Sequence, residues 1–144
     1  VEAVAKYSLA QADTGDKIVF CYYPAALCGG TIDKITVNGN DVRSECSGEH
    51  DEFIVLYYDF KQGDLIEFKY NFTPEKNKGR LGITDKTVNF ALFYPVKCVK
   101  ENGEYVMHEY AVIGDPFYFD FYDLEMHLFL PSTYALHPQG LPRC

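Results

Sequence analysis

Three aspartates lie close together in an aromatic-rich stretch near the end of the chain, and clustered carboxylates can bind a metal ion or catalyse hydrolysis. Asp115, Asp120 and Asp123 stand within the segment GDPFYFDFYD. Calcium binds several hard oxygen ligands, and a pair of carboxylates can hydrolyse a glycosidic bond. The spacing matches no known calcium loop, and an Asp-Pro step is typical of a turn. We therefore expect a loop whose aspartates cap turns, with a calcium site or a hydrolytic carboxylate pair as alternatives.

The histidines are scattered and give no pattern typical of a metal or catalytic site. They are His50, His108, His127 and His137. A zinc peptidase helix carries two histidines four residues apart, as in His-Glu-x-x-His, so that both reach the metal. His108-Glu109 is followed by Tyr-Ala-Val, so the second histidine is missing. We expect exposed or singly hydrogen-bonded histidines, and no catalytic or metal-binding residue in this chain.

The sequence also contains no clear motif for a catalytic nucleophile or for a cysteine-based site. The chain has no G-x-S-x-G motif, and the pair Gly29-Gly30 is too little for a phosphate loop. The odd number of cysteines and their spacing match no zinc knuckle. A disulfide between Cys21 and Cys28 is compatible with the turn residues between them, and free buried thiols are equally compatible. The five are Cys21, Cys28, Cys46, Cys98 and Cys144.

The size and charge of the chain limit its function classes. Its 144 residues suit one domain, 1–144, and the net charge is −8. Nucleic-acid binding needs a basic patch, and the 13 Lys and Arg residues form no run, so we expect no nucleic-acid partner. No apolar stretch has the length of a membrane span. The cellular compartment stays open, with a lean towards an extracytoplasmic or membrane-anchored parent protein.

Alternating apolar residues predict strands throughout the chain. Apolar residues alternate with mostly polar ones from Ile66 to Phe72 and from Leu124 to Leu130, as in strands with one face buried and the other in solvent. Shorter alternations fall on Ile18 to Tyr22 and Lys34 to Val37, and the N-terminal stretch suits a first strand better than a helix. The apolar run Phe53 to Tyr58 is typical of a strand covered on both faces.

Turn residues separate these strands. Asn38-Gly39 and Glu101-Asn102-Gly103 predict hairpins, since such turns need positive φ. Lys61 to Asp64 predicts a turn between two strands, and Glu75 to Gly79 a polar loop. Strands recurring at this spacing indicate an all-β fold, an antiparallel sandwich or saddle with few or no helices.

Several segments follow one another in a characteristic order along the chain. The first half carries ITVNG from Ile35 and FIVLYYDFKQGDLIEFKYNF from Phe53. The second half carries FYPV from Phe93, ENGEYV, GDPFYFDF from Gly114, and LEMHLFLPSTYAL from Leu124. In this order the segments resemble the N-terminal β-domain of bacterial M1-type zinc aminopeptidases. The resemblance covers nearly the whole chain, and GDPFYFDF followed by the LP-x-x-Y strand end is its most specific part.

The resemblance implies a saddle-shaped domain that packs beside a zinc-bearing helical domain and helps to wall a substrate cavity. The chain itself then needs no cofactor, and zinc is expected in the catalytic domain of the parent protein. That domain is the implied partner, and a peptide substrate is met only indirectly. The start at Val1 and the end at Cys144 suggest a fragment of a longer peptidase-like protein.

The loop is where we expect a partner or domain to dock, because its aromatic residues have no obvious core role. Its residues are Asp115, Pro116, Phe117, Tyr118, Phe119, Asp120 and Phe121. Full burial of Phe117 and Phe119 within this domain would count against docking. The Gln-x-Glu segment by which many such β-domains hold the substrate amine is missing from Asp85 to Pro95. An independent binding module for a protein or carbohydrate partner is the alternative function, and a free-standing hydrolase a weaker one.

Overall fold

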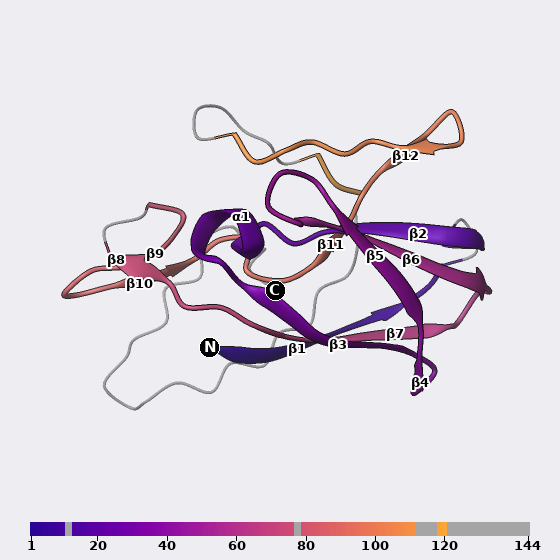
Figure 1. The fold of residues 1–144 in the computed structure, drawn as a ribbon, viewed down its shortest axis with the longest axis horizontal. Helices are drawn as coiled ribbons and strands as arrows, with labels where there is room; N and C mark the ends of the chain where they lie inside the picture. Colours follow the sequence, from indigo (N-terminus) through magenta and orange to yellow (C-terminus); the bar gives the residue numbers. More distant parts are fainter. Residues whose placement is uncertain (11–12, 77–78, 112–117, 121–144) are drawn as a thin grey trace, which may run out of the picture.

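The structure of the protein is a computed structural model that describes residues 1–10, 13–76, 79–111 and 118–120. Two four-stranded sheets lie one above the other (Figure 1), with strand orders β1-β7-β3-β4 in sheet A and β11-β2-β6-β5 in sheet B. Sheet A consists of β1 (Glu2–Ser8), β3 (Thr31–Val37), β4 (Asn40–Asp41) and β7 (Leu65–Asn71). Sheet B consists of β2 (Gly15–Cys21), β5 (Arg43–Ser47), β6 (Phe53–Phe60) and β11 (Val96–Lys97). The all-β prediction is confirmed, with antiparallel pairing throughout both sheets.

Smaller elements stand beside the two sheets. The five-residue helix α1 (Pro24–Cys28) follows β2, and no helix among the described residues is long and apolar enough to cross a membrane. The predicted polar loop from Glu75 was partly wrong, because Glu75 and Lys76 pair in parallel with β9. The remaining strands are β8 (Glu75–Lys76), β9 (Leu81–Ile83), β10 (Val88–Phe90), β12 (Lys100–Glu101) and β13 (Glu104–Tyr105).

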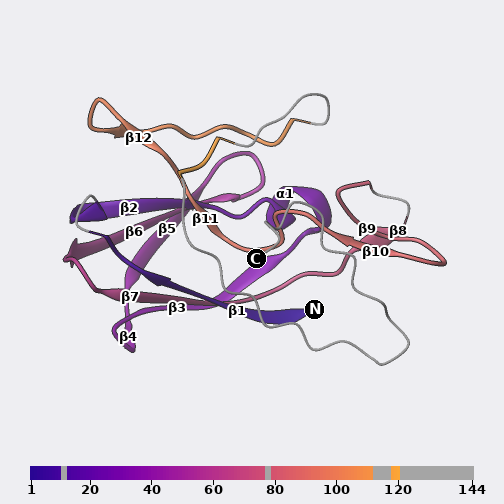
Figure 2. The ribbon, with the colours of Figure 1, turned by 180° about the vertical axis from the view of Figure 1, so that it is seen from behind.

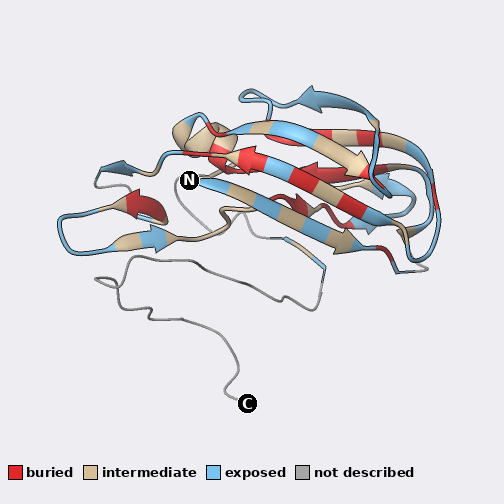
Figure 3. Cartoon of the chain, turned by 90° about the horizontal axis from the view of Figure 1, so that it is seen from below, coloured by how far each residue is buried: buried red, intermediate tan, exposed pale blue. Residues whose placement is uncertain are grey.

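The main core fills the space between sheets A and B. Alternate residues of β7 point into it, and Phe68 has no exposed surface while its neighbour Lys69 faces solvent. The ring of Phe68 meets Phe20 of β2 edge-on, with centroids 4.8 Å apart, and Tyr7 of β1 at 5.9 Å. The alternation of buried and exposed residues is visible as bands along the strands (Figure 3). The prediction of a half-buried strand from Ile66 is thus confirmed.

The predicted turns are present, and one of them does more than the sequence indicated. Asn38 and Gly39 have φ of 51° and 81° and join β3 to β4, as predicted. The turn Lys61 to Asp64 does connect two strands, but it leads from sheet B into sheet A rather than closing a hairpin. Its backbone is tied to Leu9, whose N–H donates to the Asp64 carbonyl at 3.0 Å and whose carbonyl accepts from the Gly63 N–H at 2.9 Å.

Sheet B is covered on its second face by a third layer. We call this layer the covering segment, residues 98–111 with 118–120, and Figure 2 shows part of it running alongside β2. Val19, Cys21 and Phe53 of sheet B pack in a second apolar cluster with Cys98 and, at its margin, Tyr105, Tyr110 and Phe119. Strand β2 is therefore buried on both faces, whereas the alternation from Ile18 to Tyr22 had predicted one wet face.

Candidate functional site

The structure places three residues of the predicted docking loop. Tyr118, Phe119 and Asp120 belong to the covering segment, and they lie over sheet B. Asp115, Pro116, Phe117 and Phe121 lie outside the described residues, as do Asp123, His127, His137 and the strand predicted from Leu124 to Leu130. The site is therefore built from the three described residues and their neighbours.

Phe119 anchors the covering segment to the sheet. It forms an isolated antiparallel bridge with Cys98, whose backbone N–H donates to the Val19 carbonyl of β2 at 2.9 Å. Its ring packs 6.2 Å from that of Tyr23, and Tyr23 also contacts the Tyr110 ring edge-on at 5.7 Å. Phe119 is half-buried, so its ring serves this domain's second apolar cluster as well as its surface.

Asp120 forms an ion pair rather than a turn cap. Its carboxylate lies 3.1 Å from the Nζ of Lys97, which also pairs with Asp13. The side chains of Lys97 and Asp13 are only 22% and 17% exposed, so solvent screens this pair weakly. Burial alone would lower the pKa of Lys97, but its hydrogen bonds to Asp13 and Asp120 outweigh burial and raise the pKa. The Asp120 carboxylate therefore shares one cation with Asp13, and the other two aspartates of the predicted cluster, Asp115 and Asp123, lie outside the described residues.

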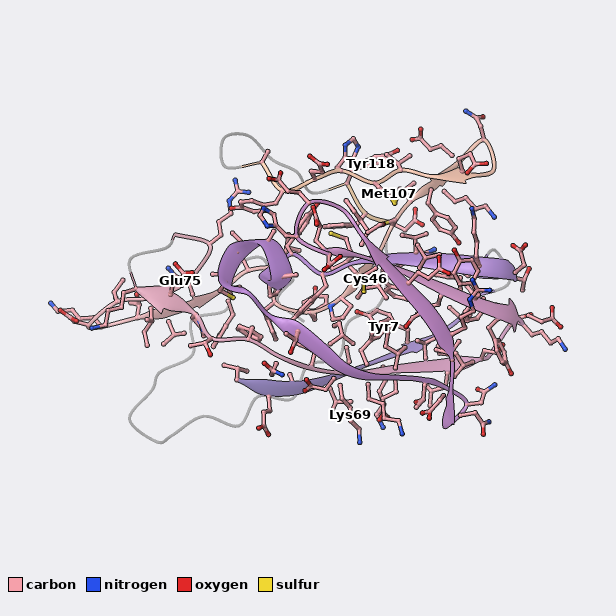
Figure 4. All side chains as sticks on the ribbon, viewed as in Figure 1. Tyr7, Cys46, Lys69, Glu75, Met107 and Tyr118 are labelled. Carbon is pink, nitrogen blue, oxygen red and sulfur yellow. The ribbon has the colours of Figure 1, made fainter. Side chains whose placement is uncertain are left out.

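The outer side of the covering segment carries an apolar patch. Met107 is 49% exposed and Tyr118 is 45% exposed, and both are labelled on this layer in Figure 4. The His108 ring packs edge-on against Tyr118 with centroids 5.9 Å apart, and the Tyr118 hydroxyl donates to the Glu101 carboxylate. We call these three residues, Met107, His108 and Tyr118, the Met107 patch. Tyr118 is thus held in place although nearly half of its surface faces solvent.

The described cysteines are free thiols. The suggested disulfide between Cys21 and Cys28 is not present, so the alternative of free thiols applies to these two residues. Burial raises the pKa of Cys98 to about 12 and also raises that of Cys21, where the nearby Cys98 and Glu52 add to the effect. A thiol must ionise to act as a nucleophile, so neither residue suits nucleophilic catalysis.

Alkylation should distinguish these thiols sharply. Exposed Cys46 is expected to react with iodoacetamide at pH 8 at least about a hundredfold faster than buried Cys21 and Cys98, whose reaction requires opening of the fold. Peptide mass spectrometry of timed samples measures the three rates separately. Equal rates in the native protein would contradict the burial of Cys21 and Cys98, and equal rates in urea serve as the control.

Two of the four histidines, His50 and His108, lie within the described residues. Both are exposed, which agrees with the prediction of exposed or singly hydrogen-bonded histidines for these two positions. No group of three or more His, Cys, Asp or Glu side chains among residues 1–10, 13–76, 79–111 and 118–120 is placed to hold a metal ion. No sequence pattern indicated the inward-facing Glu52, which is buried and lines a pocket beside helix α1.

Comparison with known proteins adds no family or function. No protein-family model, no curated protein and no solved structure matches this chain.

Proposed function

We propose that this chain is a non-catalytic β-domain of the M1 aminopeptidase N-terminal type, a scaffold that walls the substrate cavity of a zinc-bearing catalytic domain in its parent protein. The observation that carries the proposal is the ordered set of resembling segments from Ile35 to Leu136. The part described by the structure gives these segments architectural roles. ITVNG ends β3 in the turn at Asn38, and the long segment from Phe53 forms β6, the turn between sheets, and β7.

The surface of the domain also supports a scaffold role. The Met107 patch presents exposed apolar side chains on a layer that is tied down by Lys97 and Phe119. Exposed apolar groups on a rigid support are suited to a partner interface. We therefore propose that the catalytic domain of the parent chain docks against the covering segment.

An independent sugar-binding module is less well supported. Such modules use exposed aromatic platforms, whereas nearly all aromatic side chains in the described part of the chain are buried or half-buried, with Phe20, Tyr22 and Phe68 among the buried ones. Among the described residues, Tyr58 and Tyr118 are the aromatic side chains with the largest exposure.

The docking proposal predicts a selective loss of association. Substituting Met107→Glu together with Tyr118→Glu should weaken binding to the separately purified catalytic region of the parent protein by at least about tenfold, because two charges replace apolar contacts. Isothermal titration calorimetry measures the affinity. Tyr58→Glu is the matched control, since Tyr58 is comparably exposed but lies on β6.

Two results would count against the proposal. One is a parent protein that contains no His-Glu-x-x-His helix, since the implied partner would then not exist. The other is zinc-dependent hydrolysis of aminoacyl reporters by this chain alone, because a scaffold without catalytic groups has no such activity.

A further inference from the structure

A small acidic pocket lies where helix α1, the loop between β5 and β6, and the covering segment meet. Its volume is about 210 Å³, below the ~300–1,000 Å³ usual for sites that take a drug-sized ligand. The pocket therefore suits one side chain rather than a whole small molecule. The residues that matter for its chemistry are Ala26, Leu27, Glu49, Glu52, Glu109 and Tyr110.

Glu52 is the buried charge of this pocket. Its side chain lines the cavity although the residue is only 1% exposed, and it is the sole buried polar or charged residue among those described. One carboxylate oxygen, Oε2, accepts a hydrogen bond from the backbone N–H of His50 at 2.9 Å. Within the described part of the chain this is the one hydrogen bond to the carboxylate, and none of the ion pairs there includes Glu52. Burying a carboxylate without a counter-charge is generally unfavourable.

The loop before β6 is shaped to turn this carboxylate inwards. Gly48 has a φ of 96°, and a Cβ at this position would collide with the Glu52 carboxylate and with the ring of Phe53. Asp51 also has positive φ, at 56°, which only a minority of residues adopt. The Glu52 carbonyl accepts from the Tyr22 N–H at 2.7 Å, which fixes the backbone next to β2. The position of Glu52 is therefore specified from three sides.

We propose that this pocket receives one basic side chain, arginine or lysine, from a protein partner. The Glu52 carboxylate offers an open acceptor for a charge-assisted hydrogen bond, and Glu49 and Glu109 add negative charge around the cavity. Ala26 and Leu27 give apolar surface for the methylene stem, and the Tyr110 ring can contact a cation.

A protein is the source that fits the surroundings of the pocket. Glu109 lies two residues from Met107 on the same covering segment, so an apolar side chain and a basic side chain of one partner can bind side by side. An interface with an apolar centre and a desolvated charge pair is typical of protein recognition. This inference does not depend on the aminopeptidase-type function proposed above, because it uses only the pocket around Glu52 and the neighbouring surface of the covering segment.

Nuclear magnetic resonance on the ¹⁵N-labelled chain tests the proposal with the peptide acetyl-Gly-Arg-Gly-amide. Saturable shifts are expected at the amides of His50, Glu52 and Tyr110, and the neutral citrulline peptide should bind at least about tenfold more weakly, since it lacks the charge. Glu52→Gln should weaken binding of the arginine peptide by a similar factor. Glu2→Gln, an exposed change on β1, is the matched control and should leave binding unchanged.

Three results would overturn the proposal. Equal binding of the citrulline peptide would remove the role of charge. Binding of agmatine tighter than that of the peptide would indicate a small amine, not a protein, as the occupant. A strong fall in melting temperature for Glu52→Gln would show that the carboxylate is a structural group. The expected melting temperature is equal or higher, because the amide oxygen still accepts from His50 and the buried charge is gone.

Discussion

Replacing Phe68 with alanine is expected to lower the free energy of unfolding by about 3–5 kcal/mol, the range for removing a buried aromatic ring. Phe68 has no exposed surface and contacts both Phe20 of sheet B and Tyr7 of β1. Its loss would leave a cavity at the point where the two sheets meet. Since single domains are stable by only about 5–15 kcal/mol, this change removes a large part of the total.

Urea unfolding followed by far-ultraviolet circular dichroism measures this effect. Val4→Ala is the control, because Val4 lies on the outer side of β1 with 52% of its surface exposed and should change stability by less than about 0.5 kcal/mol. Equal losses of stability for Phe68→Ala and Val4→Ala would contradict the packing of Phe68 between the two sheets.

Replacing Lys97 with methionine should destabilise the protein by about 1–3 kcal/mol, a range reduced from that of fully buried pairs because Asp120 is 49% exposed. The change leaves the Asp13 and Asp120 carboxylates near each other without a cation. The contribution of Lys97 depends on pH in a defined direction. Its pKa is raised in the folded state, so the stabilisation is complete below the ordinary value of 10.5 and is lost as pH rises through the raised value.

A comparison with an exposed pair isolates the effect of burial. Lys61→Met removes the ion-pair partner of Asp59, and the side chains of both residues are more than 70% exposed. This substitution should lower the free energy of unfolding by no more than about 1 kcal/mol. Hydrogen exchange adds a local readout, because Lys97→Met should also increase exchange at Phe119, which Asp120 follows directly. Unchanged exchange there would show that the ion pair does not hold the covering segment.

Local sequence patterns were sufficient for most strands and turns. The alternation from Ile66 to Phe72 predicted β7 because one of its faces meets the core and the other meets solvent. Asn38-Gly39 predicted a turn because positive φ at two successive positions selects these residues. These features depend on residues that are neighbours in the sequence.

Features set by distant parts of the chain were not predictable in the same way. The second cover on β2 comes from Cys98 and Phe119, roughly eighty to a hundred residues later, and nothing near Val19 signals it. The turn at Lys61 has the residues of any tight turn, and its step from one sheet to the other depends on where β1 and β2 lie. A single Glu before an apolar run likewise gives no sign of burial. Gly48 was the one local signal that could have drawn attention to Glu52.

The threading of the chain between the two sheets has a consequence for how the domain comes apart. Sheet A uses the first, third, fourth and seventh strands, and sheet B uses the second, fifth, sixth and eleventh. No single cut in the polypeptide therefore separates the strands of one sheet from those of the other. Because the strands of the two sheets alternate along the chain, unfolding one sheet also displaces segments that connect to the other. Melting should proceed as one cooperative event, and a protease nick near Gly63 should yield two halves that stay associated until both are lost.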